Sequence, residues 1–149
     1  MNRKFQEKDL VLATHNFGKI EEFKHLFGKV NFNIKDIGQY SGKTPEETGG
    51  SFWENSLIKA SEATKLTGLV SLADDSGLCV DILDGAPGIY SADWAIKSDG
   101  SRDFKFATNK LLKEIEKTKF EGPCTAYFIC SLILYWPDNH FERFEGKIY

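Results

Sequence analysis

The feature that most constrains this chain is an apolar run, Gly68 to Leu72, which leads directly into Ala73-Asp74-Asp75-Ser76-Gly77. The run is rich in leucine and valine and is followed by turn-forming residues, which is the pattern of a short buried strand. Open α/β sheets place their ligands at the carboxyl ends of the strands. The sequence therefore predicts a strand over 69–73 that delivers two acids to a functional edge of a sheet.

Strand and helix patterns alternate along the rest of the chain. Apolar runs predict strands at 9–14, 30–37 and 124–136, and a strand at 141–149 that pairs with the last of these. Helical spacing of apolar residues predicts helices over 17–27, 51–66 and 104–115. Ser51, followed by Glu54, has the spacing of a capping box, and residues 39–50 form a loop rich in Gly, Thr, Pro and Glu. These patterns predict one α/β domain over residues 1–149, with a mixed sheet.

Composition and charge narrow the class of protein. The 149 residues are 41% hydrophobic and 28% charged, and the formal net charge is -3. That balance lacks the basic excess with which proteins bind nucleic-acid polymers or anionic membranes. No apolar run reaches the roughly 18 residues of a membrane helix, and residues 1–9 lack the apolar centre of a signal peptide. Three cysteines without CxxC spacing indicate neither a disulfide framework nor a zinc site. We expect a cytoplasmic protein with no membrane partner.

The segment from Thr14 to Lys19 lies where the first predicted strand turns into the first predicted helix. Backbone N–H groups at the start of that helix, together with the Lys19 ammonium, could bind a phosphate. The alternative is an ordinary turn in which Asn16 caps the helix and Lys19 is in solvent, since the segment is not a Walker P-loop. The residues alone favour the ordinary turn.

Lys59 lies on the predicted helix 51–66, on the same side as Asn55 and Glu62. Its ammonium could reach a phosphate. Charge opposite an apolar stripe is, however, what an ordinary surface helix shows, so a solvated Lys59 is the default interpretation.

Four acids form a third group, consisting of Glu46, Glu47, Asp74 and Asp75. Neighbouring side chains on a regular strand point to opposite faces, so Asp74 and Asp75 cannot both serve one site unless the turn at Ser76-Gly77 relaxes the strand. One acid is therefore expected to dominate. Acids beside a phosphate-binding segment would repel a triphosphate unless a divalent cation lay between them, and oxygen ligands suit Mg²⁺. The alternative for Asp-Ser-Gly is an Asx turn that ends a strand.

Four motifs together carry a resemblance to a known family. In chain order they are Leu12–Phe23, Glu46–Ser56 with Lys59-Ala60, Ala73–Asp81 and Gly85–Ala92. In this order and spacing they resemble the inosine triphosphate pyrophosphatase (dITP/XTP pyrophosphatase) family over about residues 10–146. The resemblance implies an elongated, two-lobed α/β fold that forms homodimers. It also implies a Mg²⁺-dependent, house-cleaning enzyme that hydrolyses non-standard purine nucleoside triphosphates (ITP, dITP, XTP) to the monophosphate and pyrophosphate.

The resemblance also assigns roles to individual residues. It implies that Asp75 is both the catalytic base and a metal ligand. Glu46 and Glu47 would complete the metal site, and Lys59 would offset charge on the leaving pyrophosphate. The substrate-binding residues would be Thr14, His15, Asn16, Phe17, Gly18, Lys19 and Ser76. A water oriented by Asp75 would then attack the α-phosphorus in line.

The sequence departs from the family in two places. His15 stands where many members have glycine. Family members also continue beyond a stretch like Phe144-Glu145-Gly146 into a Gly-Phe-Gly-Tyr-Asp motif and a Ser-His-Arg motif that line the base pocket, and neither is present before Tyr149. The chain is therefore expected to be C-terminally truncated, with an incomplete second lobe and the strand at 124–136 left as an exposed edge. The alternative function is an inactive lobe that binds nucleotide or a partner without catalysis.

Overall fold

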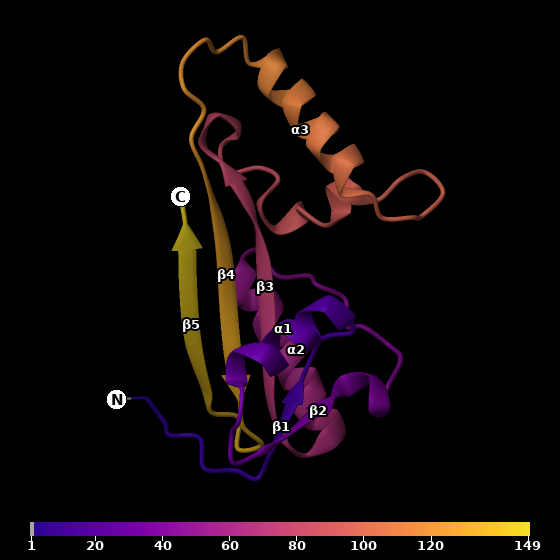
Figure 1. Ribbon diagram of the computed structural model, residues 1–149, viewed down its shortest axis with the longest axis vertical. Coiled ribbons are helices and arrows are strands. Elements are labelled where there is room, and N and C mark those ends of the chain that lie inside the picture. The colour runs from indigo at the N-terminus through magenta and orange to yellow at the C-terminus, as the bar shows by residue number, and fades with distance from the viewer. Residues whose placement is uncertain (1) are drawn as a thin grey trace. The chain divides into compact units, whose positions relative to one another are not determined.

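In residues 2–149, which the computed structural model describes, five strands form one sheet in the order β2-β1-β3-β4-β5 (Figure 1). The strands are β1 (Asp9–Leu12), β2 (Asn33–Asp36), β3 (Val70–Val80), β4 (Ala126–Tyr135) and β5 (Phe141–Ile148). The helices are α1 (Phe17–Phe27), α2 (Phe52–Thr67) and α3 (Phe104–Lys117). In this part of the chain no helix combines the length and apolar character needed to cross a membrane.

The sheet is mixed. β1 pairs in parallel with both β2 and β3, with Leu10 opposite Ile34 on one side and Val70 on the other. The arrowheads of β3, β4 and β5 alternate in direction in Figure 1, so these three strands are antiparallel. The predicted α/β fold with a mixed sheet is confirmed.

The chain divides into two compact units. The first holds the described residues up to Asp75 together with Ser131–Phe144, and the second holds Ser76–Cys130 with Glu145–Tyr149. The first unit contains β1, β2, α1 and α2, and the second contains α3. That the two units make a single domain stays a prediction.

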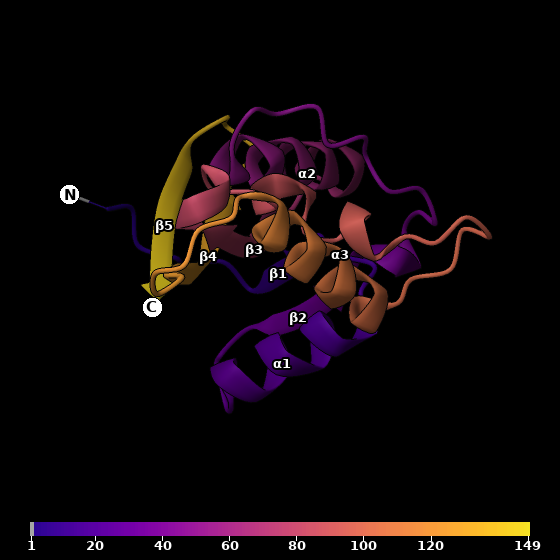
Figure 2. The same cartoon turned by 90° about the horizontal axis from the view of Figure 1, so that it is seen from above.

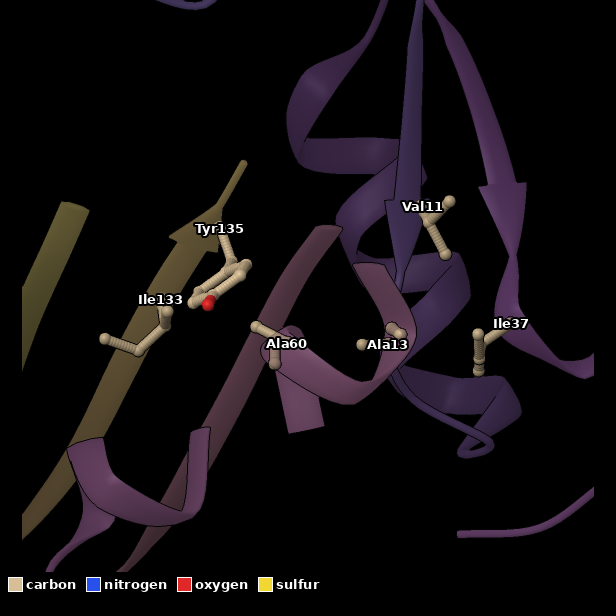
Figure 3. Close-up of a cluster of buried hydrophobic side chains, with 8 residues drawn as sticks. Val11, Ala13, Ile37, Ala60, Ile133 and Tyr135 are labelled. Carbon is tan, nitrogen blue, oxygen red and sulfur yellow. The ribbon is translucent and has the colours of Figure 1, made fainter. Parts of the chain in front are cut away.

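In the first unit, the alternation of β3 sorts its side chains between two helices. Val70 and Leu72 belong to a buried cluster that contains Ile20 of α1, whereas Ala73 belongs to a second cluster that contains Ala60 of α2. Figure 2 shows α1 and α2 on opposite faces of the sheet. Over residues 70–75 of β3, even-numbered residues therefore face α1, and odd-numbered residues face α2. Figure 3 shows part of the second cluster, with labels on Val11, Ala13, Ile37, Ala60, Ile133 and Tyr135.

Capping residues set both ends of α2. The Ser51 hydroxyl accepts a hydrogen bond from the Glu54 N–H at 3.3 Å, as the capping-box spacing predicts. The Glu54 carboxylate in turn accepts from the N–H of Gly50, at 2.8 Å. The helix ends at Gly68, whose φ of 71° is the left-handed conformation that favours glycine after a helix.

Two expectations about the strands are wrong. β3 does not end near residue 73; it continues through Asp75, Ser76 and Gly77 to Val80, because β4 remains its neighbour after β1 has ended at Leu12. The acids therefore lie within a strand, just beyond the last paired residue of its parallel partner, and not in an Asx turn. β4 is also not an exposed edge, because it lies between β3 and β5.

The second unit contains α3. The Asp103 carboxylate caps this helix and accepts from the N–H groups of Lys105 and Phe106, at 2.9 and 3.3 Å. The Lys110 ammonium lies 4.5 Å from the centre of the Trp94 ring, a cation–π contact. The predicted apolar stripe is only partly covered: Phe104 is 63% exposed, whereas its other members, Ala107, Leu111 and Ile115, are half-buried.

Candidate active site

The turn between β1 and α1 is fixed by its own side chains. The Thr14 hydroxyl accepts from the Asn16 N–H at 3.1 Å, and the Asn16 side chain accepts from the Lys19 N–H at 3.2 Å. The Lys19 ammonium donates to Oδ2 of Asp74 at 2.7 Å. The ordinary-turn interpretation is therefore half right, because Asn16 caps the helix but Lys19 is held by a buried carboxylate. Within the described residues, Oδ1 of Asp74 is buried and has no hydrogen-bond partner.

Asp75 faces the opposite side of β3. It is 7% exposed, and its Oδ2 accepts a hydrogen bond from Nδ2 of Asn55, on α2, at 3.2 Å. Asp74 instead contacts Lys19 of α1. The expectation that the adjacent acids point to opposite faces is confirmed, and the strand remains regular enough to keep them apart.

The environment of Asp75 makes it a stronger base than an ordinary carboxylate. Burial raises the pKa of Asp75 from 3.8 to about 6, and the negative charge of Glu47 adds to the rise. The Lys59 ammonium, the hydrogen bond from Asn55 and the charge of Lys19 oppose it. A carboxylate with a pKa near 6 is mostly ionised at neutral pH and still accepts a proton readily, which are the properties of a general base.

Lys59 is buried, so the solvated interpretation is wrong. It is 8% exposed, and its ammonium lies 3.0 Å from Oε1 of Glu47. The buried side of α2 is wider than its apolar stripe because small polar side chains also face the sheet. The Ser56 hydroxyl donates to the Ser131 carbonyl at 2.9 Å, and the Thr64 hydroxyl donates to the Tyr135 carbonyl at 3.2 Å.

The loop that carries Glu46 and Glu47 is held at the start of α2. The Gly49 N–H donates to Oδ1 of Asn55 at 2.8 Å. A Cβ atom at position 49 would lie 2.7 Å from that same oxygen, so the close approach of the loop requires glycine there. Both predicted metal ligands on this loop, Glu46 and Glu47, are exposed residues. Glu47 contacts Lys59, and its charge raises the pKa of Asp75.

Three of the other predicted substrate-binding residues, His15, Phe17 and Gly18, lie in the turn between β1 and α1 or at the start of α1. Phe17 is 73% exposed at the first position of α1, and Gly18 follows it. Both ring nitrogens of His15 contact the loop: Nε2 lies 2.8 Å from the Ser41 carbonyl oxygen, and Nδ1 lies 3.2 Å from the Thr44 hydroxyl oxygen. Ser76 is half-buried and is the first residue of the second unit.

Asn55 is the residue that the sequence reasoning missed. It is 2% exposed and joins the loop to the base, since its oxygen accepts from Gly49 and its nitrogen donates to Asp75. A signal was present, because Asn55 and Lys59 are four residues apart and so share one face of α2. A buried amide on the same face as a buried lysine marks a polar site and not a solvated surface.

The donors of this site are carboxylate oxygens. In residues 2–149, no three His, Cys, Asp or Glu side chains come together as a metal-binding group. Mg²⁺ usually takes only one or two carboxylates from a protein and completes its shell with water and substrate phosphates. Asp75 and Glu47, whose charges act on each other, would supply two such carboxylates.

A model of the Ham1 family matches residues 10–149. The chain belongs to the Ham1 family. Among its Ham1 relatives, a dITP/XTP pyrophosphatase from Rhizobium meliloti (strain 1021) is 45% identical over 148 residues, which are 98% of this chain and 69% of the relative. A dITP/XTP pyrophosphatase from Ruegeria pomeroyi is 44% identical over 146 residues, which are 98% of this chain and 71% of the relative.

Solved Ham1 structures share the fold. The structure of a Ham1 protein from Coxiella burnetii has a TM-score of 0.85 and 31% identity, over 95% of this chain and 71% of that chain. The Staphylococcus aureus Ham1 protein has a TM-score of 0.78 and 34% identity, over 95% and 70% of the two chains. The predicted family, its fold and the prediction of a hydrolase are confirmed by these matches.

Proposed function

We propose that this Ham1 protein is a nucleoside triphosphate pyrophosphatase that hydrolyses ITP, dITP and XTP to the monophosphate and pyrophosphate, with Mg²⁺ as its cofactor. The observation that carries the proposal is the environment of Asp75, a buried carboxylate of raised pKa that accepts a hydrogen bond from Asn55 and feels the charges of Lys59 and Glu47. Relatives named dITP/XTP pyrophosphatase at 45% and 44% identity support the choice of substrate.

Asp75 acts as the general base. At neutral pH its carboxylate is ionised, and it takes a proton from a water molecule that attacks the α-phosphorus. The bond between the α-phosphorus and the bridging oxygen breaks, and pyrophosphate leaves. Asn55 orients the base, because its amide holds Oδ2 of Asp75 and is itself held by the Gly49 N–H.

Lys19 and Lys59 bind the phosphates and offset the charge that develops on the leaving pyrophosphate. Each ammonium is paired with a carboxylate, Asp74 in one case and Glu47 in the other. A triphosphate would compete with these carboxylates for the ammonium groups. The N–H groups at the start of α1 add donors for the same phosphates, so we assign the backbone of the segment Thr14–Lys19, together with the Lys19 and Ser76 side chains, to substrate binding.

Asp75 and Glu47 would hold the Mg²⁺, with Glu46 as an adjacent carboxylate. The bound ion would neutralise charge between these acids and the phosphates. The residues present fit it, because the charge of Glu47 raises the pKa of Asp75 and a cation would relieve that repulsion. Hard oxygen donors of this kind favour Mg²⁺ over metals that prefer nitrogen or sulfur.

We also propose that the protein works as a cytoplasmic homodimer, without nucleic-acid polymers or membranes as partners. The homodimer follows from the family resemblance, and the absence of polymer and membrane partners follows from a net charge of -3. Sedimentation velocity at micromolar concentration tests the homodimer. A single species at the mass of one chain would refute it.

The proposed reaction is tested by incubating the chain with ITP and Mg²⁺ and measuring pyrophosphate and orthophosphate separately. We expect pyrophosphate and inosine monophosphate, with much slower turnover of ATP. The Asp75→Asn variant is the matched control, because it keeps the shape of the base and removes its ability to accept the proton. Release of orthophosphate alone would refute the reaction. Binding of ITP without any turnover would instead support the alternative of a lobe that binds nucleotide without catalysis.

A further inference from the structure

The loop from 41 to 50 carries two of the three predicted acidic ligands, Glu46 and Glu47, yet little of it packs against the protein. None of its residues is buried, and it belongs to no helix or strand. Its C-terminal end is fixed by the hydrogen bonds of Gly49 and Gly50 to the first turn of α2. Segments with so few buried contacts open easily, so the position of Glu47 depends on what holds the N-terminal end of the loop.

His15 provides that attachment. Its two ring nitrogens contact the Ser41 carbonyl and the Thr44 hydroxyl, at 2.8 and 3.2 Å. The Ser41 hydroxyl accepts from the Lys43 N–H at 3.1 Å, so the residues facing the imidazole form a closed turn. The contacts span 26 and 29 residues of sequence and join the loop to the turn that begins α1.

A neutral His15 imidazole can make both contacts. In the neutral tautomer that carries its proton on Nε2, the ring donates to the Ser41 carbonyl and accepts the hydroxyl proton of Thr44 at Nδ1. Both partners are then satisfied by one side chain. Glycine at this position would offer neither group.

The link from His15 to Glu47 is short and stiff. Glu47 lies three residues beyond Thr44, so their Cα atoms are at most about 11 Å apart. Pro45 lies between them, and its ring fixes its own φ and restricts the residue before it. Holding Thr44 therefore limits where Glu47 can lie relative to Lys59.

We infer that His15 is a positioning residue, which fastens the turn at 41–44 to the start of α1 and thereby places Glu47 beside Lys59 and Asp75. It acts through the loop, and its ring is not a ligand of the substrate phosphates. The consequence for turnover rests on the proposed function, whereas the attachment itself does not.

Hydrogen exchange of the ligand-free protein tests the attachment without any need for activity. His15→Ala removes both contacts, and we expect the amides of residues 42–48 to exchange about tenfold faster. Thr44→Val removes one partner at constant shape and should give a smaller change in the same direction. The double variant should exchange no faster than His15→Ala, because the two changes remove a shared contact. His15→Gln can still donate from a nitrogen in place of Nε2, and it should restore part of the protection.

Kinetics then separate positioning from phosphate binding. For His15→Ala we expect the Mg²⁺ concentration that gives half-maximal activity to rise about tenfold, while kcat at saturating Mg²⁺ changes less than about threefold. A higher KM for ITP with an unchanged Mg²⁺ requirement would overturn the inference in favour of a phosphate ligand. Unchanged exchange in His15→Ala, or additive effects of His15→Ala and Thr44→Val, would also overturn it. If His15→Ala does not fold, Thr44→Val and His15→Gln decide the question by the same exchange measurement. An inactive wild-type chain would refute the proposed function and leave the exchange test intact.

Discussion

Replacing Asp75 with asparagine is expected to stabilise the fold while it abolishes turnover. Burial raises the pKa of Asp75 from 3.8 to about 6, so the ionised carboxylate is less favourable in the folded protein than in the unfolded chain. A shift of roughly two pKa units corresponds to at most about 3 kcal/mol. Because water and nearby charges screen part of this cost, we expect a gain of about 1–2 kcal/mol. The asparagine oxygen can still accept the hydrogen bond from Asn55.

The size of the effect changes with pH in a defined window. Below about pH 4, Asp75 is protonated in both states and its burial has no ionic cost. Between about pH 4 and 6 the unfolded chain releases this proton before the folded protein does, so the wild type loses stability as the pH rises. Above about pH 6 Asp75 is ionised in both states, and the stability lost by burying its charge no longer changes with pH. The advantage of Asp75→Asn should therefore be near zero at pH 4 and full at pH 7.5.

Urea denaturation of the wild type and of Asp75→Asn at these two pH values measures the difference. At pH 7.5 we expect a higher midpoint, and in thermal unfolding a Tm higher by roughly 3–6 °C. Glu121→Gln, at an exposed position in the second unit, controls for the loss of one negative charge. A variant no more stable than the wild type at pH 7.5, or equally stabilised at pH 4, would refute the burial argument. Turnover by the variant would refute the role of Asp75 as base.

Three further outcomes follow from the same site. The kcat/KM for ITP should fall about tenfold for each pH unit below about 6, because protonated Asp75 cannot accept a proton; a flat profile between pH 5 and 7 contradicts this. Lys59→Met keeps the buried stem but should lower kcat about 10²-fold and move that acid limb to higher pH, since Lys59 holds the pKa of Asp75 down; an unchanged rate would make Lys59 a structural residue. Gly49→Ala would place a Cβ atom 2.7 Å from the Asn55 side-chain oxygen and 2.9 Å from the Asn55 backbone nitrogen and should reduce both kcat/KM and Tm, whereas Gly50→Ala, with its nearest neighbour at 3.5 Å, should leave both unchanged.

The helices were predictable because their ends are local events. α1 occupies the predicted residues 17–27, and its cap is the side chain of Asn16. α2 lies between Ser51 and Gly68, whose roles depend only on neighbouring backbone groups. The opposite faces of Asp74 and Asp75 were predictable for the same reason, because alternation is a property of the strand itself.

The errors arise where distant segments decide the outcome. β3 continues past Asp75 because β4, about 50 residues later in the chain, lies beside it, and no local pattern reports that partner. Lys59 is buried beside Glu47, which lies twelve residues earlier in a loop, while Ser56 and Thr64 of the same helix contact carbonyl groups of β4. The same packing buries Asn55, whose contacts with Gly49 and Asp75 exist only once loop, helix and strand have come together.

Side chains of β3 alternate between the two faces of the sheet. The face that each acid meets therefore depends on whether the number of residues before it in the strand is odd or even. Inserting or deleting one residue between Val70 and Ala73 would exchange the two carboxylates, so that the acid now facing Asn55 would face Lys19 instead. An insertion directly after Val70 would also move Ser71, which is fully buried on the α2 side, to the side of the apolar cluster around Ile20. Viable length variants of this strand should therefore add or remove residues in pairs, or absorb the odd residue in a bulge before Asp74.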